Sequence, residues 1–128
     1  MKDESGNAVI EFLLLGVLIL VPLLLGAASI SVIHTAETAV AAGVREAARA
    51  YSLYESDWRG RSAAHQAGAI AVTDFGIVAN PTFTISCVGL CTGVTSRVRI
   101  SGTVTVEVPF LSINHTATAT HLVTVRQP

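Results

Sequence analysis

Charged residues are scarce in this 128-residue chain. They make up 13% of it, about half of the usual quarter for soluble domains. Eight Lys and Arg nearly balance nine Asp and Glu, and the net charge of −1 gives no electrostatic reason to expect nucleic acid. Aromatic residues make up only 5%, which is too few for a surface on which bases stack. The composition therefore predicts no nucleic-acid partner.

The sequence also lacks the motifs of a catalytic site. It has no nucleophile elbow, no glycine-rich phosphate loop and no pair of carboxylates placed for a cleft. We expect neither an enzyme nor a bound cofactor. The four histidines show no metal-ligand spacing with one another or with acidic residues, so we expect no metal site: His34, His65, His115 and His121.

Cysteine is limited to two residues, Cys87 and Cys91, separated by Val-Gly-Leu. Two cysteines across a short turn with a glycine suit a disulfide in an oxidising compartment. Two free thiols are the main alternative. A structural zinc site would need two further ligands. We predict a Cys87–Cys91 disulfide, which favours a C-terminal part outside the cytoplasm.

A long apolar run dominates the N-terminal part of the chain. From Phe12 to Ile33, over 22 positions, no side chain is charged. A membrane-spanning helix needs about 20 apolar residues, so this run can cross a bilayer. Glu11 directly precedes the run. A carboxylate at this place costs free energy if it enters the membrane, so a functional role is the default hypothesis for it.

A secretory signal is the alternative to a membrane span. Gly26-Ala27-Ala28-Ser29 resembles the small-residue site at which such signals are cleaved. The apolar run continues past it through Ile30 and Ile33, and this favours a span.

The helix is predicted to continue beyond the membrane, from about Ala8 to Tyr54. The stretch after the span is rich in alanine, the best helix former, and contains no proline. Pro22 is a candidate kink, because proline removes a backbone donor inside a helix. One stripe collects mostly small and apolar side chains for packing on the protein's own sheet or on another chain: Ala36, Val40, Val44, Ala47 and Tyr51.

A second, shorter helix is predicted to begin near Trp58 to Ser62 and to end at Asp74 or Phe75. Gly76 is a plausible terminator, and Asn80-Pro81 prevents any continuation. The residues at spacings of three and four predict its buried face: Ala64, Ala67, Ile70, Ala71 and Asp74.

From Thr82 the hydrophobic period changes to two, which is typical of antiparallel strands with one buried face. We expect three or four strands. Gly102 interrupts the apolar row and indicates a bulge or a close helix contact, and Pro109 ends a strand or marks an edge. The fold class is therefore α+β: a long membrane-spanning helix, a short helix and a small antiparallel sheet. The expected inward residues are Phe83, Ile85, Cys87, Val98, Ile100, Val104, Val106, Val108, Phe110, Ala117, Ala119, His121, Val123 and Val125.

The N-terminal sequence supports a family resemblance. Gly6-Asn7-Ala8-Val9-Ile10-Glu11-Phe12 resembles the processing motif of type IV prepilins, a glycine, four small or apolar residues and Glu-Phe. With Pro22 in the span and Arg45-Glu46-Ala47-Ala48-Arg49 beyond it, the chain resembles the TadE-like pseudopilins of tight-adherence (Tad) pilus systems. The resemblance covers about residues 5–50, and the β-rich remainder is similar in layout only.

The resemblance implies cleavage between Gly6 and Asn7 by a membrane prepilin peptidase. Residues 1–6 would then be a leader, 7–54 the long helix with its span at about 12–33, and 55–128 an extracytoplasmic α+β domain. Glu11 and Phe12 would serve assembly. The implied partners are the membrane, other pilin-like subunits and the Tad assembly platform, and the implied location is the bacterial cytoplasmic membrane or the pilus.

A chain much longer than the small major pilins favours a minor or priming subunit. Two alternatives remain open. The first is a single-pass anchor that displays a small β-rich binding domain and has no link to pili. The second is a secreted binding domain released near Ala28.

Overall fold

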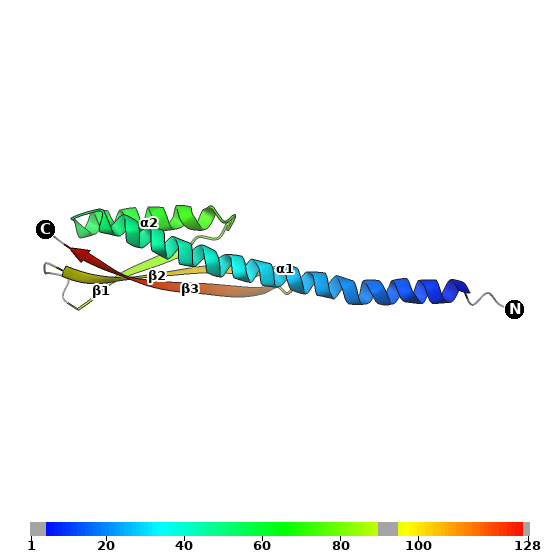
Figure 1. Cartoon of the computed structure of the whole chain (residues 1–128). Coiled ribbons are helices and arrows are strands. Elements are labelled where there is room, and N and C mark those ends of the chain that lie inside the picture. The colour runs from blue at the N-terminus through cyan, green and yellow to red at the C-terminus, as the bar shows by residue number, and fades with distance from the viewer. Residues whose placement is uncertain (1–4, 90–94, 127–128) are drawn as a thin grey trace.

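A 48-residue helix organises the structure, a computed structural model that describes residues 5–89 and 95–126. Figure 1 shows this helix running the length of the molecule, with the second helix on one side of its C-terminal part and the sheet on the other. This is the predicted α+β fold, with three strands. The elements are α1 (Ser5–Ser52), α2 (Asp57–Thr73), β1 (Thr82–Val88), β2 (Thr95–Val108) and β3 (Ile113–Arg126).

Helix α1 continues without interruption through Pro22. It begins three residues before and ends two residues before the predicted limits. At its C-terminal end the amides of Leu53 and Tyr54 bond to carbonyls three residues back, at 3.3 Å in each case. Such i to i+3 bonds tighten a last turn and end the helix.

The predicted stripe on α1 is buried, and it packs on the protein's own α2 and sheet. The charged residues beside it are exposed, as expected from their place off the stripe. Two further alanines extend the stripe. The buried α1 side chains of the core are Ala36, Ala39, Val40, Val44, Ala47, Ala48 and Tyr51.

The predicted buried face of α2 is confirmed at Ala64, is only half-buried at Ala67 and Ala71, and is wrong at Ile70 and Asp74, which are exposed. The buried residues are Gly60, Ala64, Gly68 and Val72, each four residues after the last. Ile70, predicted to be inside, is 62% exposed. The physical reason is close helix packing: a Cβ atom on Gly43 of α1 would lie 3.1 Å from the carbonyl oxygen of Gly68.

The sheet has the order β1-β2-β3 with both pairs antiparallel. Gly102 pairs with Phe83 on one side and with Ala119 on the other in unbroken register, so there is no bulge at this position. The alternative prediction, a close helix contact, is confirmed. A Cβ atom on Gly102 would come within 2.6 Å of Cγ2 of Val44 on α1.

Strand β2 ends at Val108, directly before Pro109, as predicted. The placement of Phe110 in the inward row is wrong. Its φ of +69° turns the chain out of the strand, and its side chain is 69% exposed. Ser112 also has a positive φ, of +51°, and together these residues form the turn into β3.

The predicted Cys87–Cys91 disulfide involves a residue outside the described ranges. Cys87 lies near the end of β1, and Gly89 follows that strand with a φ of +90°. This conformation favours glycine and begins the turn that the sequence predicts there. Because Cys91 is outside the described residues, the pairing remains a prediction.

Candidate functional site

The most unusual surface of the molecule is the first half of α1. Residues 7–28, here called the exposed half, are exposed to solvent except for the half-buried Leu25. Residues 29–52, the packed half, begin with the buried Ser29 and carry the α1 part of the core. Figure 1 shows the exposed half projecting beyond the sheet and α2. The boundary divides one continuous helix into two chemically different parts.

The exposed half is long and apolar enough to cross a membrane, and its most apolar window has a mean hydropathy of 2.8 with none of it buried. Its 22 residues extend for about 33 Å at 1.5 Å per residue, close to the thickness of the hydrocarbon core. Large apolar side chains point outward on every side of the helix, among them Phe12 at 77% and Leu18 at 66% exposure. Contiguous apolar surface of this size marks an interaction with lipid or protein.

The residues that the sequence singles out lie together at the start of this half. Gly6, Asn7, Glu11 and Phe12 all belong to the first turns of α1, at the end of the molecule farthest from the strands (Figure 1). Asn7 and Glu11 are four residues apart, so they lie one above the other on the same face. Within residues 5–89 and 95–126, no hydrogen bond or ion pair involves the Glu11 carboxylate.

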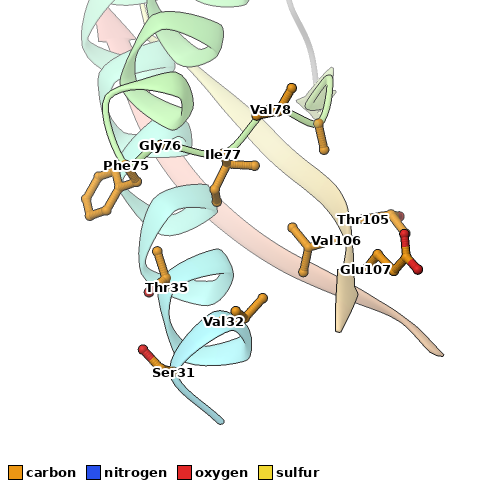
Figure 2. Close-up of a pocket in the computed structure, with 11 residues that line it drawn as sticks. Ser31, Val32, Thr35, Phe75, Gly76, Ile77, Val78, Thr105, Val106 and Glu107 are labelled. Atoms are coloured by element: carbon orange, nitrogen blue, oxygen red, sulfur yellow. The ribbon is translucent and has the colours of Figure 1, made fainter. Parts of the chain in front are cut away.

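A pocket of about 340 Å³ lies where the exposed half meets the globular part of the protein. Figure 2 shows that α1, the loop after α2 and strand β2 enclose it, with Val32, Ile77 and Val106 pointing between these segments. Glu107 at the margin is its one carboxylate. No sequence pattern predicts this pocket, because its shape depends on where the loop at 75–79 lies. Its mostly apolar lining suits an apolar group.

A polar network holds the far end of the packed half. The Tyr51 hydroxyl donates to Oδ1 of Asp57 at 2.6 Å, and Nε of Arg61 donates to Oδ2 at 2.7 Å. Arg61 also donates through Nη1 to the carbonyl of Ile85 at 2.8 Å. The network therefore ties α1, α2 and β1 together.

Both acidic groups of this network titrate outside their usual range. Burial and the hydrogen bond to Asp57 raise the pKa of Tyr51 from 10.0 to about 12. Hydrogen bonds from Tyr51 and Arg61 hold the pKa of Asp57 below its usual 3.8. Each shift preserves the protonation state in which the bond is made. We infer that the network stabilises the packing of α1, α2 and β1 on one another.

The four histidines lie apart from one another. His34, His65 and His121 are exposed, whereas His115 on β3 is half-buried with its Nε2 atom 3.8 Å from Oε1 of Glu37. Among the residues that the structure describes, no group of three or more His, Cys, Asp or Glu side chains could hold a metal ion.

No protein-family model, curated protein or solved structure matches this chain. Its architecture nevertheless has a recognisable form. A long apolar N-terminal helix followed by a small antiparallel sheet is consistent with a type IV pilin-like architecture.

Proposed function

We propose that the protein is a minor pilin-like subunit of a Tad-type pilus or secretion assembly. It is inserted in the membrane by the exposed half of α1, processed between Gly6 and Asn7, and recruited into the assembly through the same helix. The observation that supports this best is the exposed half itself. A helix that is apolar on all sides is stable only in lipid or among other helices. A subunit that assembles through this helix has it in lipid before assembly and among other helices afterwards.

The position of Glu11 fits such a role. Cleavage after Gly6 would give Asn7 an amine, which is positively charged at neutral pH because such groups titrate near 8. Glu11 is one helical turn away and has no partner within the described residues. In a bundle of helices an unpaired charge is costly, whereas a paired charge fixes register. The amine of the same chain or of a neighbour would supply that pairing.

The secreted-domain alternative has one observation in its favour. Packing on α1 starts at Ser29, directly after the small residues at which a signal peptidase would cut. Release at this point would leave the folded part intact. The single-pass anchor without pili needs the exposed half in the membrane but no processing. All three functions therefore differ in the N-terminus of the mature chain.

N-terminal sequencing of the protein recovered from its own cells separates them. A start at Asn7 supports the pilin-like subunit, a start at Met1 the simple anchor, and a start near Ser29 the secreted domain. Gly6→Val should leave the full-length chain in the membrane, because a peptidase that fits closely around a glycine cannot accommodate a branched side chain. Gly16→Val places the same side chain where no atom lies within 4 Å of the added Cβ. It serves as the control and should be processed normally.

A further inference from the structure

The turn between β2 and β3 carries a second apolar surface. Residues 109–114, here called the hairpin tip, contain no charged side chain. Three large apolar side chains of the tip are exposed, Phe110 at 69%, Leu111 at 58% and Ile113 at 53%. Because Phe110 has a φ of +69°, a conformation that L residues rarely adopt, the turn holds this ring outside the core. The tip thus presents apolar groups that the fold itself does not use.

The tip lies beside the apolar run of α1. The Ser29 hydroxyl shares its hydrogen between the carbonyl of Leu25 at 2.9 Å and that of Pro109 at 3.3 Å. The second contact brings the turn next to the helix four residues before the run ends at Ile33. Figure 1 shows the β2–β3 end of the sheet alongside α1 at this place. The contact is fixed on the helix side because Ser29 is buried. The level of the tip along α1 is therefore known.

This level coincides with the edge of a membrane. A helix crosses the hydrocarbon core in about 20 residues. Counted from Phe12, the far boundary falls at Ser31, and counted from Asn7 it falls at Gly26. Ser29 lies between these two limits. The level of the hairpin tip is consequently within about three residues of the boundary between hydrocarbon and headgroups, whether Asn7 or Phe12 marks the opposite boundary.

Glu107 on β2, which pairs with Asn114, is the charged residue nearest to the tip. Along α1, charged groups reappear only after the apolar run. The first on α1 after the run is Glu37, which lies 3.8 Å from Nε2 of His115, the first titratable residue after the tip. Glu37 is eight residues beyond Ser29, or about 12 Å along the helix axis. Charged side chains thus lie on the side of the tip toward the C-terminal end of α1, and the apolar run of α1 lies on the other side. This gradient is the one expected for a segment at a membrane interface.

We propose that the hairpin tip inserts into the headgroup region of the lipid bilayer, beside the helix that anchors the chain. Phe110, Leu111 and Ile113 enter the boundary with the acyl chains, and the tip fixes the globular part against the membrane surface at a second point. The partner is a lipid surface. This inference rests on the membrane insertion in the proposed function, and is independent of processing and of assembly into a filament.

The test uses the full chain in vesicles of phosphatidylethanolamine and phosphatidylglycerol. Trp58, the single native tryptophan, is replaced by Phe, and one tryptophan is introduced as Phe110→Trp. Lipids brominated close to the headgroup should reduce its emission on the order of twofold, and lipids brominated near the chain end should reduce it less. Leu53→Trp, at an exposed position near the far end of α1, is the matched control and should not be quenched.

A further variant, Leu20→Trp, reports on the helix alone. Quenching at Leu20 without quenching at Phe110 would overturn the proposal and leave the membrane insertion of α1 intact. Absence of quenching at both positions would overturn both. A blue shift of the Phe110→Trp emission without lipid quenching would show that a second copy of the chain covers the tip, and would also overturn the lipid assignment. Quenching at Ile113→Trp that is lost with Phe110→Asp and Leu111→Asp would support it.

Discussion

The ring of Phe83 fills the position that a side chain on Gly68 would need, because a Cβ atom built there would lie 2.7 Å from Cζ of the ring. The same ring would be 3.1 Å from a Cβ on Gly43 and 2.9 Å from one on Gly102. These glycines belong to α2, α1 and β2. One aromatic ring from β1 therefore packs against the bare backbone of three other elements, and it sets how closely they approach.

Gly68→Ala should destabilise the globular part by about 1–3 kcal/mol, because overpacking forces shifts of a rigid ring or of the backbone. Helix propensity alone would act in the opposite direction, by about 1 kcal/mol. The measurement is urea unfolding of the full chain in detergent micelles, followed by proteolysis of the region after residue 57. Ser62→Ala, at an exposed position of the same helix, is the control and should change little.

A second variant identifies the source of that loss. If the Phe83 ring is the obstacle, Gly68→Ala combined with Phe83→Leu should be less destabilised than the sum of the two single changes. Strict additivity, or a stabilising Gly68→Ala, would contradict the close packing described above.

Tyr51→Phe should destabilise the protein by about 1–2 kcal/mol, since it removes a hydrogen bond to a charged carboxylate. Asp57 keeps its second bond, from Arg61, which limits the loss. Thermal unfolding of the full chain measures it. The control is Tyr54→Phe, whose side chain is 46% exposed. An equal effect of both changes would mean that the hydroxyl of Tyr51 contributes nothing specific.

The same network predicts the pH dependence of stability. The folded-state pKa of Asp57 is lowered, so its contribution is fully present above the unfolded value of 3.8 and is lost as the pH falls below it. The folded-state pKa of Tyr51 is raised, so its contribution is present below pH 10.0 and is lost as the pH rises from 10.0 toward about 12. A series of thermal unfolding curves should show the alkaline loss reduced in Tyr51→Phe. An alkaline loss unchanged in that variant would exclude Tyr51 as its source.

Glu11→Val should abolish incorporation into, or initiation of, the pilus, while insertion and cleavage after Gly6 survive. Valine makes the span more apolar, so insertion should be unchanged or improved. Immunoblots of membrane and sheared-surface fractions, beside a count of assembled pili, measure the effect. Glu46→Val changes an exposed carboxylate of the packed half and should leave piliation normal. Normal pili with the Glu11 variant as the sole copy would refute the assembly role.

Cys87 and Cys91 should be joined in protein from the native compartment. A loop this short restricts the unfolded chain little, so the bridge should add about 2 kcal/mol or less. Mass spectrometry after alkylation without reductant decides the question. Two alkylated thiols would disprove the bridge, and the same sample alkylated after reduction is the positive control.

The sequence predicts those features that hydrophobic periodicity records. The α1 stripe from Ala36 to Tyr51 and the alternation on β2 both consist of apolar side chains whose burial is favourable. Both predictions are confirmed. Pro109 is likewise visible in advance as the end of β2, because proline has no amide donor for the ladder.

The close approach of one helix to another leaves no signal in the hydropathy of the sequence. Gly60 and Gly68 have no side chain to mark them as buried, so the apolar pattern of α2 pointed to Ile70 on the wrong face. The four-residue spacing of Gly60, Ala64 and Gly68 was the available signal, since small residues at this spacing permit close helix contact. The prediction that Phe110 points inward was wrong for the opposite reason. Its hydrophobicity predicted burial in the protein, and only the turn geometry reveals that its ring points elsewhere.

The unbroken course of α1 links the two ends of the molecule mechanically. With 3.6 residues per turn, each residue rotates the direction of the side chains by about 100°. Adding one residue to the exposed half would therefore turn the whole sheet by that angle relative to whatever holds Glu11. The face that the sheet presents to its surroundings is thus set by the number of residues between Glu11 and Ser29. Substitutions in the exposed half that keep this number preserve that orientation.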